Sequence, residues 1–122
     1  MKFIADSASG NFIRAYQPGQ LTVRDEILRC NAIISHDRII SDWQPAAINA
    51  MSIADFAAAL ELGPEIILLG TGRKQQFPHI GLMTELLQSG IAIEVMETGA
   101  ACRTFNVLLG ERRAVVAALL LD

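Results

Sequence analysis

The sequence predicts an α/β fold: a layer of strands and helices with an added layer of antiparallel strands. Three observations support this class. Residues 1 to about 50 contain short apolar runs separated by turn residues, as in antiparallel strands. From about 51 to 122, apolar runs alternate with segments of helical periodicity, as in β-α-β units. The length of 122 residues and the absence of a linker or repeat fit one domain over 1–122.

The antiparallel part begins with an apolar run at 12–16 that ends in the turn segment Gln-Pro-Gly-Gln. The run at 21–24 alternates apolar and polar residues, which is the period of a half-buried strand. The segments "NAIIS" and "RIISDW" flank His36 and Asp37 and predict a hairpin with a solvated tip. Because these connections are too short for crossovers, the strands are expected to be antiparallel.

A first helix is predicted to begin after Ser52, a good N-cap residue, with Asp55 three residues later in a variant of the capping box. Met51 and Phe56 occupy the positions of a hydrophobic staple. Gly63 and the proline that follows it end the helix.

Two apolar runs at 66–69 and 91–96 predict buried strands, and Pro78 between them suits the first turn of a helix that ends at Gly90. Strands joined through a helix of this length are parallel, with a right-handed crossover. The helix is expected to turn four apolar side chains inward: Leu82, Met83, Leu86 and Leu87.

A third helix is predicted to start with Thr98 as its cap and to end at Gly110. Arg112 and Arg113 follow, where positive charge complements the helix C-terminus. The apolar run at 114–121 predicts a last buried strand. The inward side chains of this helix are expected to be Ala101, Phe105, Leu108 and Leu109.

Composition and charge exclude several classes of protein. Ten basic and thirteen acidic residues give a net charge of −3 without a basic tract, so neither nucleic acid nor an anionic membrane surface is an expected partner. No apolar run approaches the ~20 residues that span a bilayer, so direct membrane insertion is not expected. The N-terminus shows no signal-peptide or presequence pattern, and the chain looks bacterial, which predicts a cytoplasmic protein.

The loop Gly70-Thr71-Gly72 raises the question of a nucleotide site. It matches the first two glycines of G-x-G-x-x-G, but Gln75 stands at the third. The Walker pattern fails as well, because Gln75 and Gln76 replace its second glycine and its lysine. Three interpretations stay open: a phosphate loop, another ligand or protein contact, and a plain turn that needs two flexible residues. The plain turn is favoured.

A second loop, "METGAACR", also leaves a parallel strand and enters a helix, so both loops are expected at the sheet edge where open α/β folds bind ligands. A cationic cleft beside two helix N-termini would suit a small anion. The favoured alternative is that Arg103 and Asn106 are structural polar residues. The candidate cleft residues are Gly70, Thr71, Gly72, Arg73, Thr98, Cys102, Arg103 and Asn106, with Lys74 beside them.

Cys102 is the only candidate nucleophile. A position in the first turn of a helix, beside Arg103, lowers a thiol pKa, and His79 could approach it in space. A buried cysteine that packs beneath the sheet is the more common case. Cys30 and Cys102 form no CxxC, and the two histidines make no metal constellation. No catalytic residue, metal or cofactor is therefore assigned, and a non-enzymatic protein is favoured.

The segment "IILLGTG…FP", followed by "GIAIEVMETGAACRTFNVLLGERRAVVAALL", resembles a small single-domain family of unknown function. That family includes mitochondrial complex I assembly factor 3 and an adipogenesis-associated human relative. The resemblance implies a three-layer β plus β/α fold with a mixed central sheet, no established catalytic residue, and a role in assembling a respiratory complex. The most specific matches are Met96, Thr98, Ala101, Arg103, Thr104, Asn106, Glu111, Arg113 and Ala117.

Two hypotheses of function follow. In the first, the protein is a non-enzymatic assembly or interaction factor. Hydrophobic residues make up 52% of the chain, and some of them are expected to contact either a protein partner in a membrane or respiratory complex or a second copy in a homodimer. In the second, it is a small-ligand protein or enzyme that uses the cleft between the two loops.

Overall fold

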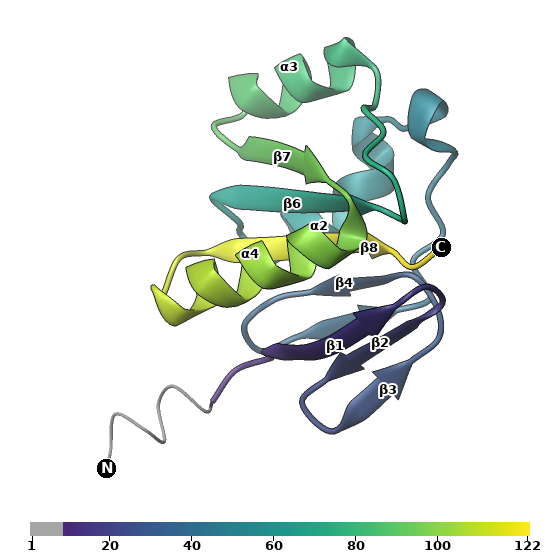
Figure 1. Cartoon of the computed structure of the whole chain (residues 1–122). Coiled ribbons are helices and arrows are strands. Elements are labelled where there is room, and N and C mark those ends of the chain that lie inside the picture. Colours follow the sequence, from purple (N-terminus) through teal and green to yellow (C-terminus); the bar gives the residue numbers. More distant parts are fainter. Residues whose placement is uncertain (1–8) are drawn as a thin grey trace.

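The computed structural model describes residues 9–122, and within them the chain forms three layers (Figure 1). A five-stranded sheet in the order β5-β4-β8-β6-β7 lies in the middle. One face carries helix α4 and a three-stranded sheet in the order β1-β2-β3, and the other face carries the remaining helices. The predicted α/β class, with its mixed sheet and added antiparallel layer, is confirmed. The N-terminus, in which no signal pattern was found, lies outside the described residues.

The small sheet is antiparallel throughout, with β1 at Ile13–Gln17, β2 at Gln20–Val23 and β3 at Glu26–Leu28. Gly19 closes the first turn with a φ of +84°, a left-handed conformation that glycine adopts without strain. Arg24, expected as the end of a strand, has a φ of +55° and lies in the turn to β3. The sequence did not predict β3, which has only three residues.

The predicted hairpin around His36 is confirmed as β4 at Ala32–Ile34 and β5 at Ile39–Ser41. It belongs to the central sheet, because β4 pairs antiparallel with β8. Only the first three strands therefore form the added layer.

The other three strands of the central sheet are parallel, as the crossover rule predicted. They are β6 at Ile66–Thr71, β7 at Ala92–Met96 and β8 at Val115–Leu120. All of β6 and most of β8 are buried, because helices or the small sheet cover both of their faces, whereas β7 is an edge strand with exposed residues.

The first predicted helix is replaced mainly by 3₁₀ turns: η1 at Ile48–Ala50, η2 at Ile53–Phe56 and only one turn of α-helix, α2, at Ala57–Leu60. The capping contact is present, since the Ser52 N–H donates to the Asp55 carboxylate at 2.9 Å. The Trp43 indole N–H donates to the Asp55 carbonyl at 2.8 Å, so an aromatic side chain occupies an acceptor that a regular helix would use.

Two further predicted helices are present, α3 at Ile80–Gln88 and α4 at Thr98–Gly110. Pro78 lies before α3, and His79 caps it by accepting the Gly81 N–H at Nδ1. In α4, Ala101, Phe105 and Leu109 are buried as expected.

One prediction for α3 is wrong, because Leu87 is 68% exposed. Leu82 and Leu86, four residues apart, form the buried face of the helix. Leu87 lies about 100° further around the helix and points away from the sheet. Met83 is half-buried against the core on the same side of the sheet as α3.

We predict that Leu86→Ala lowers the free energy of unfolding by about 2–5 kcal/mol, because it opens a cavity in a fully buried site. Leu87→Ala is the matched control and should change it by less than about 0.5 kcal/mol. Urea unfolding followed by circular dichroism measures both. Equal losses in the two variants would contradict the orientation of α3.

Candidate functional site

The glycines of the Gly70-Thr71-Gly72 loop serve close packing. A Cβ atom on Gly70 would lie 2.9 Å from both the Thr98 hydroxyl and a Leu119 methyl group. Gly72 has a φ of +89°, and a Cβ there would lie 2.2 Å from the Asp122 carbonyl oxygen. Both glycines therefore let the end of β6 approach α4 and the end of β8, where any side chain would collide.

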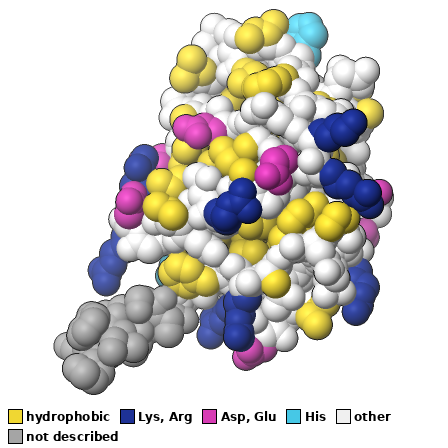
Figure 2. Space-filling model, viewed as in Figure 1, with side chains coloured by type: hydrophobic (Ala, Val, Ile, Leu, Met, Phe, Trp, Pro, Cys, Tyr) yellow, Lys and Arg dark blue, Asp and Glu magenta, His cyan; other side chains and the backbone are white. Residues whose placement is uncertain are grey.

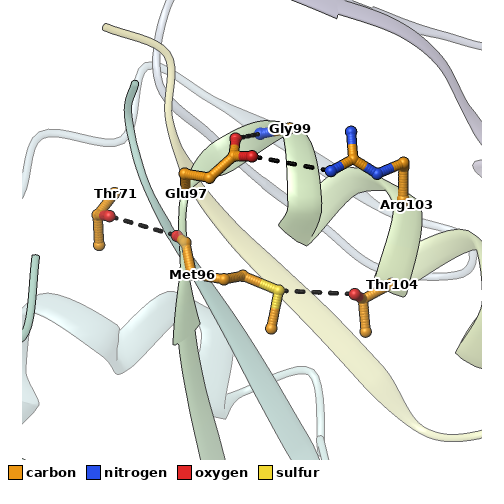
Figure 3. A network of polar contacts seen from close by, with 6 residues as sticks. All are labelled: Thr71, Met96, Glu97, Gly99, Arg103 and Thr104. Atoms are coloured by element: carbon orange, nitrogen blue, oxygen red, sulfur yellow. Dashed lines mark hydrogen bonds and ion pairs between the residues drawn. The ribbon is translucent and has the colours of Figure 1, made fainter. Parts of the chain in front are cut away.

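Thr98 joins the two loops directly. Its hydroxyl donates to the Leu120 carbonyl at 2.5 Å and accepts the Gly72 N–H at 2.7 Å. Its own N–H donates to the Gly72 carbonyl at 2.8 Å. Thr98 is fully buried and is not the helix cap that the sequence predicted. Glu97 is the N-cap, and its carboxylate accepts the Gly99 N–H at 2.7 Å (Figure 3).

Thr71 is also used within the fold. Its hydroxyl lies 2.6 Å from the Lys74 carbonyl and 3.3 Å from the Met96 carbonyl, and it accepts the Gln76 N–H at 3.1 Å. Figure 3 shows the contact with Met96, which ties the end of β6 to the end of β7. These hydrogen bonds hold the loop against the sheet, and the residue Thr71 is only 2% exposed.

Asn106 binds the small sheet to α4. Its side-chain amide donates to the Ile13 carbonyl and its oxygen accepts the Ile13 N–H, both at 2.8 Å. The side chain thus satisfies the backbone of β1 as a neighbouring strand would.

The two arginines of the candidate cleft lie in exposed ion pairs. Arg73 is 3.6 Å from the Asp122 carboxylate, and Arg103 is 3.7 Å from the Glu97 carboxylate (Figure 3). Both arginine side chains are more than two-thirds exposed, so these pairs contribute little to stability.

A cavity of about 200 Å³ lies between β1 and α4. Burial is the main cause that raises the pKa of Tyr16 in its wall, with the neighbouring Cys102 and Glu97 acting in the same direction. The Tyr16 hydroxyl donates to the Leu121 carbonyl at 3.3 Å. The lining residues are Ile13, Arg14, Ala15, Tyr16, Gly99, Cys102, Arg103 and Asn106.

The Cys102 thiol is buried, and burial raises its pKa to about 12, more than the nearby Arg103 lowers it. The expectation of a lowered pKa from helix position and charge is therefore wrong, because loss of hydration outweighs both effects. His79, the base considered for it, caps α3. Both cysteines in the described part of the chain are free thiols.

Seven of the eight predicted cleft residues thus fall into two groups, and Arg73 belongs to neither. Gly70, Thr71, Gly72 and Thr98 interlock at the ends of the parallel strands, whereas Cys102, Arg103 and Asn106 line the cavity beside β1. Arg73 pairs with Asp122 and does not line that cavity. Sequence reasoning missed Tyr16 and Glu97. Glutamate is not a residue type preferred at an N-cap, and nothing in the sequence places β1 against α4.

Three further properties of the described residues bear on the site: the pairing of buried polar groups, the clustering of possible metal ligands and the length of apolar helices. Within residues 9–122, every buried side-chain nitrogen or oxygen has a hydrogen-bond partner. Over the same range, the acidic, histidine and cysteine side chains form no group of three or more that could hold a metal ion. None of the helices there has the length and apolar character needed to cross a membrane.

We predict that Thr98→Val lowers the free energy of unfolding by about 2–4 kcal/mol, because the Gly72 N–H and the Leu120 carbonyl both lose a buried partner. Thr98→Ser keeps the hydroxyl and should cost about 1 kcal/mol, the effect of one buried methyl group. Thermal and urea unfolding measure the two variants. A loss in Thr98→Ser as large as that in Thr98→Val would show that the hydroxyl does not bridge the loops.

Comparison with known proteins gives relatives over nearly the whole chain. The NADH dehydrogenase (ubiquinone) 1 alpha subcomplex assembly factor 3 of Danio rerio is 29% identical over 117 residues, which cover 94% of this chain and 67% of that protein. This chain therefore spans about two thirds of the factor's length. The 13 kDa major membrane protein of Francisella tularensis is 30% identical over 89 residues, which cover 73% of this chain and 68% of that protein.

A crystal structure from Bordetella parapertussis has the same fold, with a TM-score of 0.82 and 32% identity over 93% of this chain and 98% of that one. The family model described as "Protein of unknown function (DUF498/DUF598)" matches residues 13–120, from the first residue of β1 to the last residue of β8. The chain belongs to this DUF498/DUF598 family.

Proposed function

We propose that this protein is a non-enzymatic interaction factor that assists the assembly of a respiratory NADH dehydrogenase. The observation that carries the proposal is the relationship to assembly factor 3, which extends over 94% of this chain. The family model covers residues 13–120, a range that contains every strand of the central sheet, on which an interaction surface would be built.

The site geometry supports an interaction role over catalysis. The polar groups of the two loops hydrogen-bond to each other, and the thiol of Cys102 has a raised pKa, which disfavours the nucleophilic thiolate. By contrast, several large apolar side chains face solvent, as they do at surfaces that contact partners. They are Ile27, Phe77, Ile80, Leu87 and Val107.

The proposed place of action is the cytoplasmic side of a membrane that carries the respiratory complex. The relative from Francisella tularensis is named a membrane protein. A factor that docks on membrane-bound subunits would need no spanning helix of its own, and it would be recovered with membranes through its partner.

A second candidate function, the binding of a small anion, is favoured by the cavity between β1 and α4. Arg14 and Arg103 line it, together with Tyr16 and Asn106. Its volume of about 200 Å³ is below the ~300–1,000 Å³ of usual ligand sites, which restricts an occupant to small ions such as phosphate.

To test the assembly role, we predict that deleting the gene in its host lowers the amount of assembled NADH dehydrogenase. The readouts are blue-native electrophoresis of membranes and NADH oxidation activity, and a plasmid copy of the gene should restore both. An unchanged level of assembled enzyme in the deletion strain would refute the proposed function.

To test the second candidate, we predict that phosphate raises the melting temperature of the wild-type protein and that Arg103→Ala abolishes this shift. Arg73→Ala is the matched control, because Arg73 is exposed to a similar degree but does not line the cavity. Equal shifts in the wild type and Arg103→Ala would remove Arg103 from any anion site there.

A further inference from the structure

The outer edge of β7 is the longest strand edge that the fold leaves uncovered. Among the described residues, β3 and β5 also lie at sheet edges, but each has only three residues. The edge of β1 faces α4, and there Asn106 satisfies both backbone groups of Ile13. Exposed strand edges are templates for another strand.

The backbone of β7 and of Ile91 just before it turns six hydrogen-bonding groups towards this edge. The Ala92 N–H donates to the Glu65 carbonyl beyond the start of β6, so alternate residues (Ala92, Glu94 and Met96) bond to β6. The groups of Ile91, Ile93 and Val95 consequently point outward.

The two outermost of these groups are already satisfied inside the protein. The Ile91 N–H donates to the Leu86 carbonyl at 3.1 Å, and the Val95 carbonyl accepts the Gln75 side-chain amide at 2.9 Å. The groups between them are left for a partner: the Ile91 carbonyl, both groups of Ile93 and the Val95 N–H. They match the hydrogen bonds that a short added strand would make.

The two faces of β7 differ in chemistry. Ile93 and Val95 point to the α3 side, where α3 and the loop before it expose Phe77, Ile80 and Leu87 at 60%, 70% and 68%. Figure 2 shows hydrophobic side chains gathered over α3 at the top of the molecule. Ala92 and Glu94 point to the opposite side and are exposed.

The acidic residues at and near β7 favour an added strand that carries positive charge. No lysine or arginine occurs from 75 to 102, a stretch that contains Glu85, Glu94 and Glu97. Glu97 pairs with Arg103, whereas Glu85 and Glu94 make no ion pair with another described residue. In a second copy paired through β7, two Glu94 carboxylates would lie on the same face, so like charge opposes self-pairing.

We propose that the edge of β7 accepts an extended segment of a protein partner. This segment places basic side chains beside Glu94 and apolar side chains towards α3. The inference rests on the proposed function, which it deepens by assigning the surface and the chemistry of the partner. Backbone bonds to Ile93 would supply affinity, and the alternation of basic and apolar residues would supply specificity.

The test uses two synthetic probes, a short peptide of alternating lysine and valine and a matched peptide of alternating glutamate and valine. Nuclear magnetic resonance of the full chain should show that the lysine peptide shifts the amide signals of Ile93 and Val95 and slows their hydrogen exchange. Glu94→Lys should weaken binding of the lysine peptide about fivefold to tenfold and favour the glutamate peptide, since attraction becomes repulsion.

Glu26→Lys is the matched control, because it makes the same charge change at the exposed edge strand β3 and should bind like the wild type. Ile93→Pro is a second variant: it removes an outward N–H without touching the ladder to β6 and should abolish binding. The Glu94→Lys result stands if Ile93→Pro fails to fold.

Three results would overturn the proposal: no shift at Ile93 and Val95 with either peptide, equal effects of Glu94→Lys and Glu26→Lys, or sedimentation of the wild type as a dimer paired through β7. The last result would assign the edge to a second copy. Peptide binding at β7 with normal NADH dehydrogenase assembly in the deletion strain would refute the proposed function alone. Full complementation of that strain by Glu94→Lys and by folded Ile93→Pro would refute the β7 inference alone.

Discussion

The hydroxyl of Thr98 holds together the carboxyl ends of the parallel strands. It donates to the last residue of β8 and accepts from the loop that follows β6, while it stands in the first turn of the helix that follows β7. A buried side chain that satisfies two backbone groups at once leaves little freedom to any of the three segments. The two glycines permit this contact, because a side chain at Gly70 would collide with Thr98 of α4 and one at Gly72 would collide with Asp122 beyond β8.

The added layer is attached to this frame at two places. Asn106 of α4 pairs with the backbone of Ile13, and the Leu121 carbonyl beyond β8 accepts the Gly19 N–H and the Tyr16 hydroxyl. Helix α4 therefore packs against the central sheet and β1 together. This shared helix explains why one core cluster joins the small sheet, α4 and one face of the central sheet.

In these attachments the polar groups of Asn106 and Tyr16 bind the backbone within the protein, whereas the outer edge of β7 is left without a neighbouring strand. Most residues of the expected ligand cleft bind other groups of the protein, whereas β7 has an outer edge and α3 exposes large apolar side chains. A relative that is named an assembly factor is consistent with a scaffold that offers a strand edge to a partner.

The class of the fold followed from the sequence alone, because apolar periodicity and short turns are local properties. They predicted β6, β7, β8, α3 and α4 and the parallel direction of the three strands, but not the strand order. The sequence also identified the two loops as neighbours. The role of those loops became clear only from their contacts in the folded chain. The sequence predicts Thr98 as a helix cap, but in the fold its hydroxyl donates to the carbonyl of Leu120 in β8. The sequence also suggests a lowered pKa for Cys102, but burial raises the pKa of its thiol. Both outcomes depend on segments distant in the chain, whose contacts no local pattern encodes.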